Sequence, residues 1–170
     1  MKLKLFIAST LDGYIATKDH KLDWLFEVEG EGDNGFGEFY QTIDTVIMGK
    51  NTYDWLKSEQ PNSWPYSDKE SYIFTHKKQK NTDGIKFIEV SNLLEFTQNL
   101  TGNVWVVGGG NVIKYFLENH LIHELQVTIA PVLLGDGIPL FPSGNYSEKL
   151  NLINTKTYGQ FVELHYSVKS

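Results

Sequence analysis

The sequence predicts an α/β protein in which a mainly parallel central sheet carries helices on both faces and ends in an antiparallel hairpin. Strand-like apolar runs alternate with helix-like stretches along the 170 residues, which is typical of parallel strands joined by helical crossovers. One apolar run leads through three consecutive glycines into a helix. The final stretch alternates apolar and polar residues on either side of a turn. The length suits one domain spanning residues 1–170.

In the first half of the chain, short apolar runs and amphipathic stretches define the expected elements. Strands are expected over residues 3–9, 45–48, 71–75 and 86–90. Helices are expected over residues 35–43, 52–56 and 92–99. Asn51 is expected to cap the second helix, and Asn92 and Glu95 have the spacing of a capping box at the third.

The second half contains the glycine corner and the terminal hairpin. A strand over residues 104–107 precedes Gly108, Gly109 and Gly110, and the helix after them has one apolar face. The residues of that face are Val112, Ile113, Phe116 and Leu117. A further strand is expected over residues 124–130. Strands over residues 150–157 and 160–168 would form a hairpin around Tyr158-Gly159.

The glycine run indicates a site for an anion. Glycines between a buried strand and a helix let the backbone approach a ligand closely, because no side chain intervenes. The free N–H groups and the dipole at the start of the helix then favour an anion, most often a phosphate. A tight strand-to-helix turn that binds nothing explains the same residues equally well. The run is not the dinucleotide fingerprint, since Ile113 stands where its third glycine belongs.

Composition excludes several classes of protein. The formal net charge of −6 opposes general nucleic-acid binding, which needs a basic face. No apolar run has the length of a membrane span, and without an export signal the chain is expected in the cytoplasm. The absence of cysteine excludes disulfides and thiolate metal sites, and the scattered histidines predict no metal. The chain also has no arginine, so no guanidinium group is present to bind a carboxylate through two parallel hydrogen bonds.

Two long loops are candidates for the border of a site. Residues 18–34 carry several acidic side chains around Trp24, and residues 58–69 carry two prolines around Trp64. In open α/β sheets, ligands bind beyond the carboxyl ends of the strands, where such loops lie.

Four blocks in a fixed order carry a family resemblance. They are Ala8-Ser-Thr-Leu-Asp-Gly-Tyr-Ile-Ala16, Val46-Ile-Met-Gly-Lys-Asn-Thr-Tyr53, residues 104–110, and Glu124-Leu-Gln-Val-Thr-Ile-Ala-Pro-Val-Leu-Leu-Gly-Asp-Gly137 continuing to Leu140-Phe141. Together they resemble the dihydrofolate reductase-like superfamily. The Pro-Val-Leu-Leu-Gly-x-Gly part makes the sequence most similar to the branch with the reductase domain of the bifunctional riboflavin-biosynthesis deaminase–reductase. The resemblance implies a three-layer fold and NADPH as hydride donor.

The resemblance also assigns cofactor contacts. Lys50 and Thr52 are expected at the cofactor phosphates, the three glycines at the pyrophosphate, and Ala8 and Ile15 at the nicotinamide. The whole expected set is Ala8, Ile15, Gly49, Lys50, Asn51, Thr52, Thr75, His76, Lys77, Gly108, Gly109, Gly110, Asn111 and Val112. For Lys77 a solvated surface charge is the favoured alternative, and Asp12-Gly13 also suits an ordinary turn.

Asp33 and Thr128 are the expected catalytic residues on the same resemblance. Dihydrofolate reductases carry a carboxylate on the helix before the strand at 45–48, and counting back places Asp33 there. Thr128 matches the partner threonine. Such a carboxylate would hold a pterin-like or pyrimidine-like ring and help to deliver a proton. Asp33 precedes Asn34-Gly35, so capping of the helix is the competing interpretation.

The leading functional hypothesis is an NADPH-dependent reductase acting on a small heterocyclic (pterin- or aminouracil-like) or carbonyl substrate, with the cofactor carrying the chemistry. Authentic dihydrofolate reductase is disfavoured, because that family binds the glutamate tail of folate with arginine and this chain has no arginine. There are two alternatives. One is a riboflavin-pathway reductase, in which lysine would bind the ribose phosphate of the substrate. The other is a nucleotide-binding protein without turnover. The resemblance further implies a homodimer.

Overall fold

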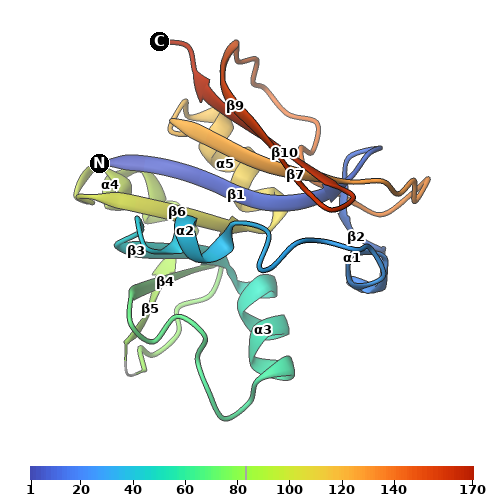
Figure 1. Cartoon of the computed structure of the whole chain (residues 1–170). Helices are drawn as coiled ribbons and strands as arrows, with labels where there is room; N and C mark the ends of the chain where they lie inside the picture. The colour runs from blue at the N-terminus through green and yellow to red at the C-terminus, as the bar shows by residue number, and fades with distance from the viewer. Residues whose placement is uncertain (83) are drawn as a thin grey trace.

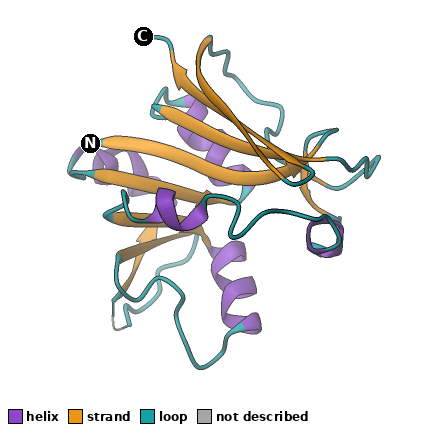
Figure 2. Cartoon of the chain, in the orientation of Figure 1, coloured by secondary structure: helices purple, strands orange, loops and turns teal. Residues whose placement is uncertain are grey.

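The computed structural model describes residues 1–82 and 84–170, and its elements alternate as expected (Figure 1, Figure 2). The strands are β1 Lys2–Thr10, β2 Tyr14–Ala16, β3 Thr45–Gly49, β4 Glu70–Thr75, β5 Ile85–Glu89, β6 Asn103–Gly108, β7 Glu124–Ala130, β8 Ile138–Pro139, β9 Leu150–Tyr158 and β10 Phe161–Val168. The helices are α1 Asp23–Phe26, α2 Phe36–Tyr40, α3 Lys50–Glu59, α4 Leu93–Gln98 and α5 Gly110–Glu118, with a 3₁₀ turn over Val90–Asn92.

The main sheet has the strand order β5-β4-β3-β6-β1-β7-β10-β9. The strands from β5 to β7 run parallel, and β10 and β9 add an antiparallel hairpin at one edge. A separate small sheet pairs β2 with β8. Because β1, β3, β4 and β6 are parallel neighbours, their carboxyl ends share one edge of the sheet.

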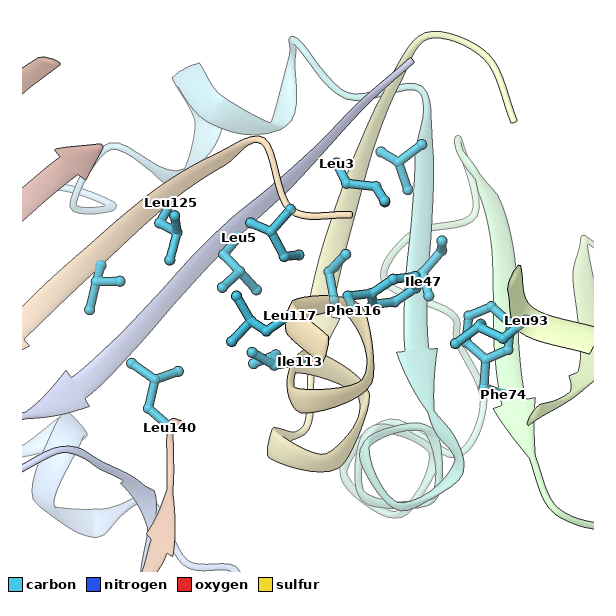
Figure 3. Close-up of a cluster of buried hydrophobic side chains, with 14 residues drawn as sticks. Leu3, Leu5, Ile47, Phe74, Leu93, Ile113, Phe116, Leu117, Leu125 and Leu140 are labelled. Carbon is cyan, nitrogen blue, oxygen red and sulfur yellow. The ribbon is translucent and has the colours of Figure 1, made fainter. Parts of the chain in front are cut away.

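Helices cover both faces of the sheet, which confirms the predicted fold class. On one face, Ile113, Phe116 and Leu117 of α5 are turned toward the strands (Figure 3). On the other face, α2 and α3 pack against the sheet through separate clusters. Successive side chains of strand β3 point to opposite faces of the sheet. Ile47 packs on the face that α5 covers and Met48 on the face that α3 covers, and both side chains are fully buried. Burial on both faces explains why β3 is a continuous apolar run.

The two predicted helix caps had different outcomes. Helix α3 begins at Lys50, directly after the extended residue Gly49, so Asn51 lies inside the first turn and the prediction that it caps the helix was wrong. Asn92 holds the N-cap position of α4, as predicted, but within the described residues its side chain makes no capping hydrogen bond, so the capping box is not formed. At α3 the chain turns into a helix earlier than the polar residue suggests, so the spacing from Asn51 to the next N–H groups does not fit a cap.

The remaining differences concern short elements. Helix α1 and the small β2–β8 sheet were not predicted, because a helix of four residues and strands of three and two residues have too little periodicity to detect. The hairpin turn lies at Gly159 and Gln160, since Tyr158 still pairs with Phe161. None of the helices in the described ranges is long and apolar enough to cross a membrane.

Candidate functional site

Two helices begin side by side at the carboxyl edge of the sheet. Strands β3 and β6 are parallel neighbours, with Met48 in register with Gly108. Helix α3 follows β3 directly and helix α5 follows β6 across Gly109. Both N-cap residues, Gly49 and Gly109, are glycines and carry no side chain to bond the first backbone N–H groups. The corner therefore presents two sets of helix N-terminal amides, which favour an anion.

Close packing requires the glycines at this corner. Gly108 has φ +131°, a conformation that side chains disfavour. A Cβ at Gly110 would lie 2.8 Å from the carbonyl oxygen of Pro139, and one at Gly49 would lie 3.0 Å from a methyl of Val112. Gly109 differs, because a Cβ there would meet only the Thr52 hydroxyl at 3.6 Å. The space in front of Gly109 is thus open, and the peptide bond between Gly108 and Gly109 is cis.

Lys50 lies in the first turn of α3. Its ammonium pairs with the carboxylate of Asp54 one turn later and lies 5.4 Å from the centre of the Tyr53 ring. Asn51, beside it, and Asn111, in the first turn of α5, are exposed. The basic group expected at the cofactor phosphates is therefore at the corner but already has an acidic partner.

Thr75, His76 and Lys77 follow β4, the strand next to β3. Thr75 is buried, and its hydroxyl accepts a hydrogen bond from the backbone N–H of Lys77 at 3.3 Å. His76 and Lys77 are exposed. The structure places the expected cofactor residues along one row, at the carboxyl ends of β4, β3, β6 and β1.

The two residues expected at the nicotinamide lie on β1 and on the small sheet. Ala8 is in register with Thr128 of β7, and Ile15 of β2 packs against the core cluster of α5. The turn between them is held by Asp12, which accepts hydrogen bonds from the Thr10 hydroxyl at 2.6 Å and the Gly135 N–H at 2.8 Å. The Asp12-Gly13 turn therefore has a structural role, as its simpler interpretation predicts.

A cavity of about 450 Å³ opens beside Ala8. Both expected catalytic residues, Asp33 and Thr128, line it together with Ala8. The whole lining is Phe6, Ala8, Leu25, Phe26, Val28, Gly30, Gly32, Asp33, Asn34, Thr128 and Phe161. Three aromatic rings among these residues suit a flat ligand.

Asp33 has two roles in the structure. Its carboxylate oxygens accept hydrogen bonds from the backbone N–H groups of Gly35 at 3.0 Å and Gly37 at 2.8 Å, at the start of α2. It thus caps the helix, as the competing interpretation of the sequence proposed, while its exposed side lines the cavity. Thr128 is 5% exposed and lies in the floor.

Two residues near the cavity were missed from the sequence. Glu163 of β10 is opposite Thr128 in the antiparallel register and is only 4% exposed. Tyr158 of β9 brings its hydroxyl over Gly35, where a Cβ would lie 2.5 Å from it. The alternation of β10 puts Glu163 on the same face as Phe161, and that signal was available in the sequence.

A second hollow, of about 590 Å³, lies at the other edge of the sheet, between β5, α4 and residues 78–81. It contains none of the expected site residues and is bordered mainly by exposed polar side chains. Across residues 1–82 and 84–170, no group of three His, Asp or Glu side chains is arranged to hold a metal. The smaller cavity beside Ala8 is therefore the candidate site.

The chain is similar to known proteins along nearly its whole length. It is 44% identical to the uncharacterized protein YwjB of Bacillus subtilis (strain 168), over 97% of each chain. A crystal structure of a putative riboflavin biosynthesis protein from Shewanella sp. PV-4 superposes with a TM-score of 0.85 at 31% identity and covers 100% of both chains. Dihydrofolate reductase from Enterococcus faecalis, in complex with NADP(H) and RAB-propyl, shares the fold with a TM-score of 0.67 at 18% identity, covering 99% of this chain and 97% of that one.

The family model of the RibD C-terminal domain matches residues 60–164. This stretch includes the glycine corner, β7 and most of the terminal hairpin, and it agrees with the fold likeness to both solved structures. The chain belongs to the RibD C-terminal domain family.

Proposed function

We propose that the protein is a reductase that binds NADPH and transfers a hydride to a small heterocyclic (pterin- or aminouracil-like) or carbonyl substrate. The observation that carries this proposal is the corner where α3 and α5 begin side by side, next to a cavity lined by Ala8 and Thr128. The family and the shared fold with a dihydrofolate reductase that binds NADP(H) support it. NADPH would supply the hydride and its electron pair.

The chain's own residues fit an extended dinucleotide along the row of strand ends. The amides around Gly109, Gly110 and Asn111 would hold the pyrophosphate. Lys50 and Thr52 would bind phosphate from the start of α3, and residues 75–77 would border the adenosine side. Ala8 and Ile15 would flank the nicotinamide, so the adjoining cavity would hold the acceptor ring.

In the cavity, the protein would position the acceptor and exclude water. Phe6, Phe26 and Phe161 provide flat apolar walls, and Thr128 provides a hydroxyl in the floor. Both Asp33 oxygens already accept hydrogen bonds from backbone N–H groups, which favours an orienting role over proton donation. If Asp33 does not donate a proton, these hydrogen bonds also favour the second candidate, a nucleotide-binding protein without turnover.

The proposal extends to assembly and location. Strand β9 is the free edge of the main sheet and bears exposed Leu150, Leu152 and Ile153, so we propose a homodimer formed through this edge. The protein would act in the cytoplasm, with a small-molecule substrate and without nucleic-acid or membrane partners.

Gly109→Ala tests the site directly. The methyl fits the fold, since its nearest atom would be the Thr52 hydroxyl at 3.6 Å, but it would occupy the space in front of the amides. We expect NADPH to quench the tryptophan fluorescence of the wild type and to bind about tenfold or more weakly to the variant. Unchanged thermal unfolding would show that the fold is intact.

The outcomes separate the candidate functions. Binding of neither NADPH nor NADH by the wild type would exclude both candidates. Binding without oxidation across a panel of pterins, aminouracils and carbonyls would favour the nucleotide-binding protein. Equal NADPH affinity of the wild type and Gly109→Ala would contradict the proposed pyrophosphate site.

A further inference from the structure

Asp33 is the only charged residue among the eleven that line the candidate cavity, and it belongs to an acidic segment. Between Leu22 and Gly49 the sequence has seven acidic residues and no lysine, arginine or histidine. They are Asp23, Glu27, Glu29, Glu31, Asp33, Glu38 and Asp44. Seven of the eleven cavity-lining residues belong to this segment, and none of the eleven is basic.

A buried carboxylate lies behind the cavity lining, on the same face of the sheet as Thr128. Glu163 is 4% exposed and pairs across the strands with Thr128, so its side chain lies on the cavity face of the sheet. One of its oxygens accepts a hydrogen bond from the Gln126 side-chain amide at 3.2 Å. Among residues 1–82 and 84–170, no basic group lies within 4.0 Å of it. Its cross-strand partner on β9 is Lys156, whose ammonium lies 3.8 Å from Glu38 instead. A carboxylate favours a nearby cation and repels an anion.

The neighbouring side chains agree with a negative local field. Burial raises the pKa of the Tyr158 hydroxyl, and the carboxylate of Glu163 is the next largest cause. Lys156 acts against this effect on the pKa of Tyr158, but its ammonium lies at the exposed edge, 3.8 Å from Glu38. Lys156 also stands on β9, outside the cavity lining.

We propose that the cavity takes flat rings that are neutral or cationic, such as amines, amidines and iminium ions of nitrogen heterocycles, and rejects rings that carry phosphate or carboxylate. This inference rests on the proposed function, which makes the cavity the acceptor site. An anionic substituent would lie beside Asp33, above the face of the sheet that bears Glu163, with no basic lining residue to neutralise it. The acceptor would therefore differ from a folate with its glutamate tail and from a uracil bearing a ribose phosphate.

Three rings of the same shape test the charge selection. Benzamidine, benzamide and benzoate carry positive, neutral and negative charge on one benzene ring. Each is titrated into the full-length, ¹⁵N-labelled protein, with and without NADPH, and amide shifts of the cavity residues give the dissociation constants. We expect benzamidine and benzamide to bind at least about tenfold more tightly than benzoate.

Variants identify the source of the selection. Glu163→Gln keeps the shape and a hydrogen-bonding oxygen, and it should shrink the difference between benzamidine and benzoate. Asp33→Asn, at the exposed rim, is a second variant that does not depend on the buried position. Glu59→Gln, at the end of α3 and exposed, is the matched control and should leave the order unchanged.

Two results would overturn the inference: benzoate binding as tightly as benzamidine, or no shift of cavity residues with any of the three rings. Failure of the proposed function looks different, because NADPH would then leave the tryptophan fluorescence unchanged while the order of the three rings persisted. If NADPH is bound and oxidised but a phosphate- or carboxylate-bearing acceptor is preferred, the proposed function stands and the charge selection fails.

Discussion

Single charged residues decide which ligand each part of the site accepts. Lys50 is the basic residue at the α3 terminus, but its ammonium is held by Asp54 in an i,i+4 pair. Their side chains are 33% and 55% exposed, so this pair contributes only about 0.2–1 kcal/mol. An incoming phosphate would compete with Asp54 for the same ammonium. In the proposed complex, Asp54 would therefore weaken discrimination between NADPH and NADH.

Asp54→Asn should strengthen NADPH binding about two- to fivefold and leave NADH binding unchanged, because Lys50 is released for the 2′-phosphate. Fluorescence titrations at one fixed ionic strength measure both affinities. Lys50→Ala is the reciprocal variant and should weaken NADPH more than NADH. Equal effects on the two cofactors would remove Lys50 and Asp54 from 2′-phosphate recognition.

At the scale of elements, the site depends on connections between short segments. The turn after β1 is tied to residues 134–135 through Asp12, and Gly13 accepts a hydrogen bond from the N–H of Leu140 at 2.9 Å. The β2–β8 pair continues this connection, and the carbonyl of Pro139 packs on Gly110 at the start of α5. The Asp12 carboxylate thus connects the turn after β1 to the segment that packs on the glycine corner.

The connection through Asp12 should depend on pH. The hydrogen bond from the Thr10 hydroxyl lowers the pKa of Asp12 most, and the N–H groups of Gly135 and Leu134 lower it further. With its folded pKa below the unfolded value of about 3.9, Asp12 stabilises the fold above that pH, and the contribution is lost as the pH falls through the folded pKa. We expect Asp12→Asn to have a lower Tm than the wild type at neutral pH.

The difference in Tm between wild type and Asp12→Asn should shrink below about pH 4, as the wild-type carboxylate is protonated. Circular dichroism melts across the acid range measure it. Glu59→Gln, at an exposed position, serves as the comparison and should follow the wild type. Parallel Tm profiles for Asp12→Asn and wild type would show that Asp12 does not stabilise the loop.

At the scale of the whole molecule, the sheet leaves one long edge exposed. Every residue of β9 from Leu150 to Thr157 is exposed, including Leu152 at 60% and Ile153 at 50%. The opposite edge, β5, is only five residues long. Because an exposed apolar edge strand pairs readily with another chain, β9 is the surface expected in the proposed homodimer.

Leu152→Asp should convert the proposed dimer into a monomer, since a carboxylate on both copies would be desolvated at the interface. Size-exclusion chromatography with light scattering gives the mass of each form. Leu133→Asp places the same charge at a position that is 72% exposed and lies outside the hairpin, and should leave the dimer intact. A monomeric wild type would refute the proposed homodimer.

Much of the site was predictable from local patterns. Gly108–Gly110 between an apolar strand and an amphipathic helix indicated a helix N-terminus open to an anion, and the resemblance assigned Asp33 and Thr128 to the substrate and Ala8 to the nicotinamide. These features depend on neighbours in sequence, where periodicity and glycine conformations act directly. Phe26 and Val28 were hidden, because α1 is a single turn whose position is set by contacts with β7 and β10.

The sequence by itself determined the alternation of the longer strands and helices, the glycine corner and the acidic run from residue 23 to residue 44, because each is a property of contiguous residues. Only the tertiary structure decided that Glu163 and Ala8 stand on either side of Thr128. Strand register and side-chain pairing bring these groups together, and register depends on the packing of the whole sheet instead of on any local segment.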